Sequence, residues 1–148
     1  MKTTSTTLDK LGALALQVGG DRRATCYLAG PMRGYPEYNF PAFHAGAAEL
    51  RAAGWTVFSP AERDEADPNV DLESEAVKQG LEVNGLAYYM QFDLPAVCNS
   101  DAVFLLPGWE ASVGARLEVR VALAVEKRVF TLEDLAEFTL DLVKPVSG

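Results

Sequence analysis

The sequence predicts an α/β protein in which an open parallel sheet of about four to five strands carries helices on both faces. Short apolar segments alternate with longer segments of helical periodicity, which is the order expected of parallel strands joined by helices. The clearest strand is Ala102 to Leu106, where every side chain is apolar, as in a central parallel strand covered on both faces. A helix that Pro41 opens and Gly54 closes has the residue types that favour those two positions.

The elements follow one another without repeats or low-complexity tracts. We expect strands at 25–29, 55–58, 102–106 and 128–131, and helices at 8–17, 41–54, 70–78, 84–94, 112–126 and 133–143. The helix at 84–94 can continue past Pro95. The acidic, proline-containing stretch Glu62 to Asn69 is predicted to be an exposed loop or a lid. We assign residues 1–22 to an N-terminal extension and residues 23–148 to the α/β domain.

The composition is typical of one globular domain. A chain of 148 residues is long enough for a proper core, and 49% hydrophobic and 23% charged residues are ordinary values. The net charge of −8 argues against binding of a nucleic-acid polymer, which needs a basic surface, but leaves room for a single nucleotide in one cationic pocket.

The cysteines and the N-terminal region indicate a cytoplasmic protein. Cys26 and Cys98 are interpreted as small core residues of a reducing compartment. One histidine and two isolated cysteines cannot form a zinc site. The apolar run from Leu11 to Val18 is too short to cross a membrane.

Glu118 is the strongest candidate for a catalytic residue. On the helix after strand 102–106, its neighbours at offsets of three, four and seven are all apolar: Ala111, Ala115, Val121, Ala122 and Val125. A carboxylate on the apolar face of a buried helix is costly unless it is paired or used. Glu118 would also lie near the positive end of the helix dipole. The alternative is a structural glutamate that pairs with an arginine or caps a neighbour.

Asp93 is a second carboxylate on an apolar helix face. Its neighbours at the same offsets are Leu86, Tyr89, Met90 and Val97, and Pro95 is expected to kink or restart this helix. Two inward carboxylates separated by a strand suit glycosyl chemistry. One attacks or stabilises C1′ of a sugar, and the other handles protons or positions the leaving base.

Two loops could hold a ligand, because ligands bind beyond the carboxyl ends of the strands in open α/β sheets. The loop Gly30 to Gly34 joins a glycine backbone to Arg33, which could grip a phosphate or simply lie in a solvated turn. In the loop 107–114, Ser112 and the amides near Gly114 could hold an anion, and serine is also a favoured N-cap. Trp109 could stack on a base, or be a partly buried loop residue.

Three other polar residues are interpreted differently. Asp101 precedes its strand, lies at the opposite edge of the sheet and is expected to be structural. His44 and Glu62 are expected on solvated surfaces.

Five groups of residues occur together in this chain. They are Tyr27-Leu28-Ala29-Gly30-Pro31-Met32-Arg33-Gly34, Tyr38-Asn39, Ser59-Pro60, Tyr89-Met90 with Asp93-Leu94, and Leu106-Pro107-Gly108-Trp109 with Ser112, Gly114 and Glu118. The combination resembles the nucleoside 2-deoxyribosyltransferase-like superfamily, above all a branch common in phages and bacteria, over residues 24–130. The resemblance implies a flavodoxin- or Rossmann-like domain with a glutamate nucleophile that forms a glycosyl-enzyme intermediate at C1′. Glu118 matches that glutamate, and Asp93 matches the aspartate near the leaving base.

One position in this resemblance separates two activities. Six residues before the nucleophile, transferases that use free nucleosides carry an acidic residue, whereas deoxynucleoside 5′-monophosphate N-hydrolases carry the serine that Ser112 reproduces. Arg33 also matches those hydrolases. The resemblance thus implies an N-glycosidase that cleaves the base–sugar bond of a (deoxy)nucleoside 5′-monophosphate. Alternatives are 2-deoxyribosyl transfer between nucleobases, a nucleotide-sensing module without turnover, and cleavage of the nicotinamide–ribose bond of a dinucleotide.

The implied site needs no metal or organic cofactor. Its catalytic residues are Glu118 and Asp93, and its substrate-binding residues are Tyr27, Gly30, Met32, Arg33, Gly34, Asn39, Trp109, Ser112 and Gly114. The expected partner is a small-molecule nucleotide or nucleoside, with no membrane. The superfamily implies a homodimer or a higher homo-oligomer, and the helix at 133–143 could form the contact or pack on the core.

Overall fold

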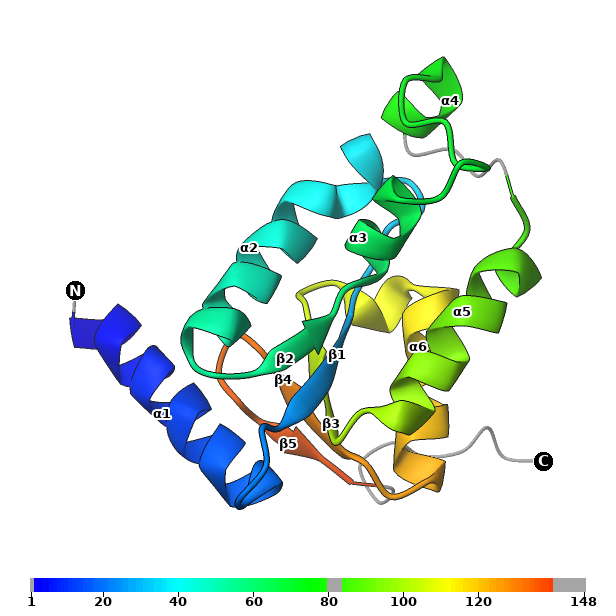
Figure 1. The fold of residues 1–148 in the computed structure, drawn as a ribbon. Coiled ribbons are helices and arrows are strands. Elements are labelled where there is room, and N and C mark those ends of the chain that lie inside the picture. Colours follow the sequence, from blue (N-terminus) through cyan, green and yellow to red (C-terminus); the bar gives the residue numbers. More distant parts are fainter. Residues whose placement is uncertain (1, 80–83, 140–148) are drawn as a thin grey trace.

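A five-stranded sheet in the order β2-β1-β3-β4-β5 runs through the middle of the protein (Figure 1). Its strands are β1 (Thr25–Ala29), β2 (Thr56–Phe58), β3 (Ala102–Leu105), β4 (Arg128–Thr131) and β5 (Glu137–Phe138). The first four are parallel, and β5 pairs with β4 in the antiparallel sense. This computed structural model describes residues 2–79 and 84–139. The predicted open α/β sheet is confirmed, and the four predicted strands agree with the observed ones to within one residue.

Helices cover both faces of the sheet (Figure 1). On one side lie α1 (Lys2–Gly19), α2 (Phe40–Ala52) and α3 (Pro60–Glu65), and on the other lie α5 (Leu86–Asn99) and α6 (Val113–Ala124). The remaining helical elements are short: α4 (Glu75–Lys78), which stands apart from the sheet, and the 3-10 turns η1 (Pro36–Asn39) and η2 (Trp109–Ala111). No helix in the described part of the chain combines the length and the hydropathy that a membrane span requires.

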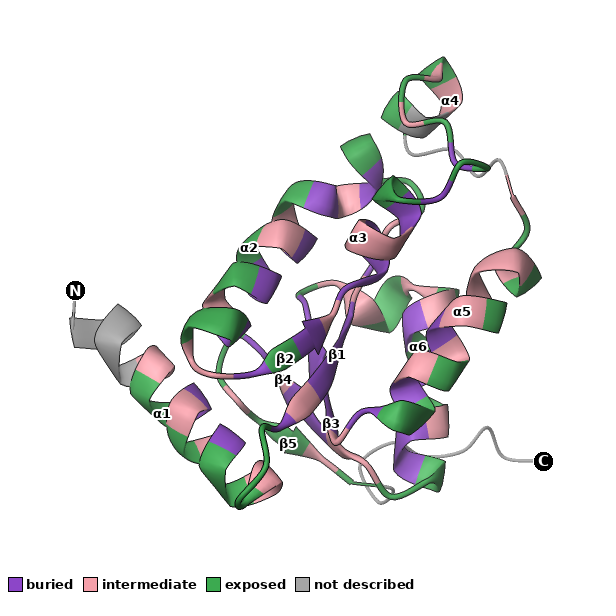
Figure 2. Ribbon diagram, in the orientation of Figure 1, coloured by how far each residue is buried: buried purple, intermediate pink, exposed green. Residues whose placement is uncertain are grey.

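Successive side chains of each strand point to opposite faces of the sheet, so the hydrophobic core is divided between these two faces. Leu28 and Phe104 pack with α1, α2 and α3, whereas Tyr27 and Val103 pack with α5 and α6. All four residues are completely buried, and Figure 2 shows the buried positions along the strands and on the inner sides of the helices. The apolar run at 102–105 therefore reflects a central strand that is covered on both sides, as the sequence predicts.

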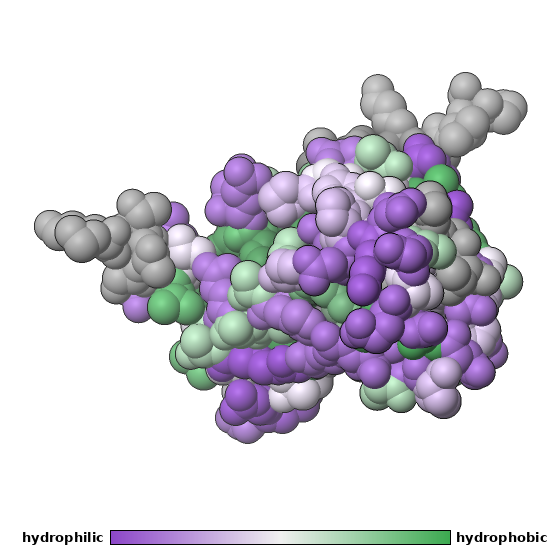
Figure 3. All heavy atoms as spheres, turned by 90° about the horizontal axis from the view of Figure 1, so that it is seen from above, coloured by the Kyte–Doolittle hydropathy of each residue, from purple (hydrophilic) through white to green (hydrophobic). Residues whose placement is uncertain are grey.

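The chain leaves β1 and β3 on opposite faces of the sheet. After β1 it continues into α2 on one side, and after β3 it continues into α6 on the other. Because β1 and β3 are neighbours, the loops that follow them diverge at the carboxyl edge of the sheet and leave a crevice between them. The view onto this edge is mostly hydrophilic, with hydrophobic side chains showing between the polar ones (Figure 3).

The prediction of an exposed loop or lid at 62–69 is wrong for its first half, whereas residues 66–69 do form a largely exposed turn. Residues Pro60–Glu65 form α3, and the side chains of Asp64 and Asp67 are buried. Arg63 explains their burial, because its Nη2 atom lies 2.8 Å from Asp64 Oδ1 and 2.7 Å from Asp67 Oδ2. The guanidinium compensates the two buried charges, which composition alone assigns to the surface.

The predicted helix at 133–143 is also wrong over its described part. Residues 132–134 form a turn and β5 follows at 137–138, while 140–143 lie outside the described residues. Arg128 holds β5 against β4 through two bonds of 2.8 Å to Glu137. A short antiparallel return on β4 thus takes the place of the helix.

Smaller differences concern helix ends and one cysteine. The helix predicted at 70–78 shrinks to α4, and the helix predicted at 84–94 continues through Pro95 to Asn99. Cys26 is buried as expected, but Cys98 is exposed, because it lies on the outer side of the last turn of α5. The residues before β1 form α1, whose Leu11 is fully buried, and the domain boundary at residue 22 stays a prediction.

Candidate active site

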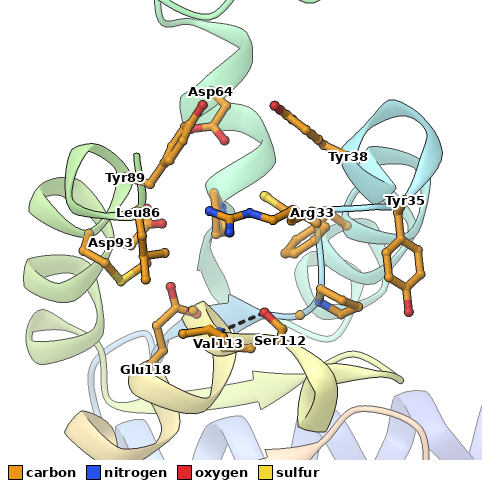
Figure 4. Close-up of a pocket in the computed structure, with 18 of the residues that line it drawn as sticks. Arg33, Tyr35, Tyr38, Asp64, Leu86, Tyr89, Asp93, Ser112, Val113 and Glu118 are labelled. Atoms are coloured by element: carbon orange, nitrogen blue, oxygen red, sulfur yellow. Dashed lines mark hydrogen bonds between the residues drawn. The ribbon is translucent and has the colours of Figure 1, made fainter. Parts of the chain in front are cut away.

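A cavity of about 340 Å³ lies at the carboxyl edge of the sheet, between the loops that follow β1 and β3 (Figure 4). Seven residues predicted for the site line it: Gly30, Met32, Arg33, Asp93, Ser112, Gly114 and Glu118. Other lining residues were not assigned to the site from sequence, among them Tyr35, Tyr38, Asp64, Leu86, Tyr89 and Met90. Both predicted carboxyls and the predicted anion-binding groups therefore share one cavity.

Glu118 lies on α6 with its carboxylate directed into the cavity (Figure 4). Its side chain is 4% exposed, and Oε2 accepts a hydrogen bond of 2.7 Å from the hydroxyl of Tyr27. Burial raises the pKa of Glu118 well above its usual range, and the charge of Asp93 adds to this rise. The hydrogen bond from Tyr27 opposes it. The site thus holds a poorly solvated carboxyl group whose charged form is stabilised by one phenol.

Tyr27 lies beneath the cavity and does not line it. It belongs to β1, is completely buried, and stacks on Phe58 of β2 with the ring centroids 5.6 Å apart. Burial raises the pKa of the Tyr27 hydroxyl, and the neighbouring carboxylate of Glu118 raises it further. This phenol therefore stays protonated and acts as a hydrogen-bond donor to Glu118.

Asp93 projects from α5 into the wall of the cavity. It is 5% exposed, and its Oδ1 atom has no hydrogen-bond partner among the described residues. Burial raises the pKa of Asp93 to about 7, with the Asp64 carboxylate adding to the rise and the Arg63 guanidinium opposing it. The helix continues through Pro95, so the proline expected to disturb Asp93 leaves it at the cavity. A carboxyl with this pKa can both give and take a proton near neutral pH.

A helix start and a cation also line the cavity. Ser112 is the N-cap of α6, and its Oγ atom accepts a hydrogen bond of 3.1 Å from the amide of Ala115. Gly114 belongs to the first turn, whose amides and dipole favour an anion. Arg33 extends from the loop after β1 with its guanidinium inside the cavity (Figure 4). Ser112 is therefore an N-cap, and it also lines the cavity where an anion would be favoured.

Besides Tyr27, three predicted substrate-binding residues do not line the cavity. Gly34 has a φ of +85°, which only glycine adopts easily, so it shapes the turn after Arg33. Asn39 donates from Nδ2 to the carbonyl of Pro31 at 3.0 Å and ties the same loop. Trp109 packs edge-to-face against Phe138 of β5, with ring centroids 5.4 Å apart. These residues support the loops around the cavity, and any contact with a ligand stays a prediction.

Sequence reasoning did not assign Tyr38 or Asp64 to the site. Tyr38 is 3% exposed and lines the cavity from η1, where Glu37, Tyr38 and Asn39 have left-handed φ values of 55°, 52° and 61°. No sequence pattern announces three such residues in a row, because each carries a Cβ atom. For Asp64 a signal exists: Pro60 favours a helix start, and Asp64 follows it by four positions, on the same face.

Residues outside the cavity have structural partners. Asp101 lies at the opposite edge of the sheet, where its carboxylate accepts two bonds of 2.7 Å from Arg22 and one of 2.9 Å from the Thr25 amide. His44 and Glu62 lie at the partly exposed surface and pair with Glu65 and Arg51. Over residues 2–79 and 84–139, no group of three or more His, Cys, Asp or Glu side chains is placed to hold a metal ion.

Comparisons with known proteins agree with this fold. Residues 24–131 match the family described as a domain of unknown function, DUF4406. The structure is similar to that of a 2-deoxyribosyltransferase from the psychrotolerant bacterium Bacillus psychrosaccharolyticus, with a TM-score of 0.50 and 24% identity over 73% of this chain and 71% of that one. Among curated proteins, none matches the sequence. The chain therefore belongs to the DUF4406 family and has a nucleoside 2-deoxyribosyltransferase-like fold.

Proposed function

We propose that this protein is an N-glycosidase that cleaves the base–sugar bond of a (deoxy)nucleoside 5′-monophosphate, with Glu118 as nucleophile. The observation that carries this proposal is the pair of buried carboxyls, Glu118 and Asp93, in one cavity that Arg33 and the start of α6 also line. Carboxyl pairs of this kind serve glycosyl chemistry when one can attack and the other can exchange a proton.

In the first step, a carboxylate oxygen of Glu118 attacks C1′ of the sugar. The bond between C1′ and the base nitrogen breaks, and its electron pair leaves with the base. Asp93, whose pKa of about 7 keeps it partly protonated near neutral pH, supplies the proton that neutralises the base. The product is a free base and a sugar phosphate esterified to Glu118.

In the second step, water attacks C1′ and the bond between C1′ and Glu118 breaks. Asp93, now a carboxylate, takes the proton from the water, so both carboxyls return to their starting states. The sum is nucleotide plus water giving free base plus (deoxy)ribose 5-phosphate. Tyr27 supports both steps, because its hydrogen bond to Oε2 stabilises the charge on Glu118 whenever the carboxylate is free.

The phosphate of the substrate is assigned to the start of α6, at Ser112 and Gly114, with Arg33 as the cation that lines the same cavity. A doubly charged phosphate is favoured by the positive end of the α6 dipole and by a guanidinium, which can donate two parallel hydrogen bonds. Ser112 brings no charge of its own, and the first turn of α6 holds no acidic residue that would repel the anion. This chemistry favours a nucleotide over a free nucleoside.

A second candidate is 2-deoxyribosyl transfer, in which a second base replaces water in the second step. The similarity in fold to the 2-deoxyribosyltransferase of B. psychrosaccharolyticus favours it. The two activities share the glycosyl-enzyme intermediate and differ only in what resolves it. An experiment therefore distinguishes the two activities by their final products, because the first step is the same in both.

The test is incubation of the purified protein with a panel of deoxynucleoside and ribonucleoside 5′-monophosphates, with and without a second free base. Products are separated by chromatography and identified by mass. Free base plus sugar 5-phosphate supports hydrolysis, and base exchange alone moves the assignment to transfer. Glu118→Gln is expected to lower kcat/KM by roughly three orders of magnitude or more, because the amide cannot attack C1′.

Asp101→Asn is the matched control, since it also replaces a carboxylate by an amide but lies at the opposite edge of the sheet. It is expected to leave turnover unchanged. If every nucleotide is bound and returned intact, the enzyme assignment fails and a nucleotide-sensing module takes its place.

A further inference from the structure

We infer that the carboxylate of Asp64 selects the nucleobase, favouring a base with an exocyclic amino group over its oxo counterpart. The inference rests on the proposed function, because it assigns the remaining end of the same cavity. Its subject is a third buried carboxylate in the cavity wall, which the two-step reaction does not use.

Asp64 is buried and is held in place by hydrogen bonds from a guanidinium. Its residue is 2% exposed, and Oδ1 accepts hydrogen bonds from Arg63 Nε at 3.1 Å and Nη2 at 2.8 Å. The same guanidinium binds Asp67 at 2.7 Å and lies 3.8 Å from the centroid of the Phe92 ring. The neighbouring cation compensates the charge of Asp64, and the packing of Arg63 fixes its direction.

Asp64 lies in the part of the cavity where the base of a bound nucleotide is expected. In Figure 4 it lies at one end of the cavity with Tyr38 and Tyr89 beside it, and Ser112 lies at the other end. Glu118 lies near Ser112 at that second end, and Asp93 lies between the two ends. A nucleotide with its phosphate at Ser112 and C1′ at Glu118 has the rest of the cavity left for its base, and this part is lined by Asp93 and then Asp64.

The chemistry of a carboxylate decides which base edge it accepts. An ionised Asp only accepts hydrogen bonds, and its two oxygens offer about four acceptor positions. An exocyclic amino group donates to such an oxygen. An exocyclic carbonyl presents lone pairs to it instead, and the ring N–H of an oxo base is flanked by at least one such carbonyl. A hydrogen bond to a charged group corresponds to a preference of roughly ten- to a hundredfold.

The experiment compares kcat/KM within two pairs of substrates that differ only in amino against oxo: dCMP with dUMP, and dAMP with dIMP. We expect the wild-type protein to prefer the amino member of the pair it accepts by roughly tenfold or more. Asp64→Asn, which has nearly the same shape but can also donate, is expected to bring this ratio close to one. Glu65→Gln is the matched control, because Glu65 is the next residue on α3 and pairs with His44 at the surface.

Each outcome separates this inference from the proposed function. A wild-type ratio near one, or a ratio that survives in Asp64→Asn, overturns the role of Asp64 and leaves the hydrolase in place. An equal loss of activity on both members of a pair gives Asp64 a structural role and also overturns it. If no nucleotide is hydrolysed by the wild type, the proposed function fails, and equilibrium binding of the same pairs to wild type and Asp64→Asn decides on Asp64.

Should Asp64→Asn fail to fold, product inhibition of the wild-type protein by free bases gives the answer. Cytosine is expected to inhibit at a lower concentration than uracil, and adenine at a lower concentration than hypoxanthine. Equal inhibition within both pairs would overturn the inference.

Discussion

The hydroxyl of Tyr27 donates a hydrogen bond of 2.7 Å to Oε2 of Glu118, and both side chains are shut away from water. The bond joins strand β1 to helix α6, and its two residues lie 91 positions apart in the sequence. Burial and the charge of Asp93 raise the pKa of Glu118, whereas the hydrogen bond from Tyr27 lowers it and so favours the charged form. A buried glutamate that must attack carbon depends on such a donor.

Tyr27→Phe is therefore expected to lower kcat by roughly ten- to a hundredfold, the loss of one hydrogen bond to a charged group. It should also move the acidic limb of the kcat/KM profile to higher pH, because the pKa of Glu118 rises further without the donor. The measurement is a pH–rate profile of both proteins. An unchanged acidic limb would show that Tyr27 acts only in packing, since the Phe ring keeps the stacking on Phe58.

Asp93→Asn is expected to lower activity and to raise stability. The pKa of Asp93 is raised by burial to about 7, so the stability associated with its protonated form is present at low pH and lost as pH rises through that value. An amide does not ionise, so the variant does not lose this stability. Above neutral pH its free energy of unfolding should exceed that of the wild type by about 2 kcal/mol. Denaturant unfolding at acidic and alkaline pH measures it.

The same variant tests the acid role of Asp93. In the wild type, kcat/KM should fall as pH rises through about 7, because the proton that the leaving base needs is lost. In Asp93→Asn this alkaline limb should disappear together with most of the activity. A variant that keeps the wild-type alkaline limb would assign that limb to another group.

Arg63→Met is expected to move the alkaline limb of the wild-type profile to higher pH. The guanidinium of Arg63 opposes the rise in the pKa of Asp93, so its removal raises this pKa further. The variant should also lose about 3 kcal/mol of stability, because the carboxylates of Asp64 and Asp67 stay buried without their cation. A pH–rate profile distinguishes this effect from a loss of folded protein, which would change the amplitude alone.

Arg51→Met is the control for Arg63→Met. Arg51 also forms a pair with a carboxylate, Glu62 at 2.5 Å, but both side chains are about two-fifths exposed. Its removal should cost less than about 1 kcal/mol and leave the pH profile unchanged. A shift of the profile in this variant as well would show that the response does not report on Asp93.

Ser112→Asp tests the phosphate end of the cavity. Aspartate is as good an N-cap as serine, so the start of α6 should stay intact, whereas the added charge repels a phosphate. We expect kcat/KM for a nucleoside 5′-monophosphate to fall by roughly tenfold or more, and that for the free nucleoside to stay within a few-fold. Ser112→Asn, which caps without charge, should behave like the wild type. Equal changes in kcat/KM for both substrates would show that the phosphate does not bind at this end of the cavity.

The fold could be predicted from sequence because its signals are local. The fully apolar run of β3 and the Pro-to-Gly span of α2 are each written in one stretch of chain. Glu118 and Asp93 could be found for the same reason, since each breaks an apolar helix face. The prediction that these two residues share one site rested on their inward helix faces and on the family resemblance, because the rule that ligands bind beyond the strand ends places only the loops.

What could not be predicted depends on partners from elsewhere in the chain. Asp64 was taken for a surface residue because its compensation by Arg63, and the stacking of Arg63 on Phe92, involve three-dimensional contacts. The helix expected at 133–143 has the right periodicity, but pairing with β4 overrides it over the described residues. The predicted homo-oligomer and the cytoplasmic location stay predictions, as does the base preference.

The hydrogen bond between α1 and the core involves a tryptophan, so its state can be followed by fluorescence. Trp55 donates from its indole Nε1 to the carbonyl of Leu11 at 3.0 Å, is completely buried, and meets Phe104 edge-on at 5.0 Å. If the N-terminal helix lifts away, this indole loses its acceptor and meets water. With Trp109 replaced by phenylalanine, the emission wavelength of a single tryptophan then follows the attachment of α1, and the protein carries its own fluorescent reporter of that event.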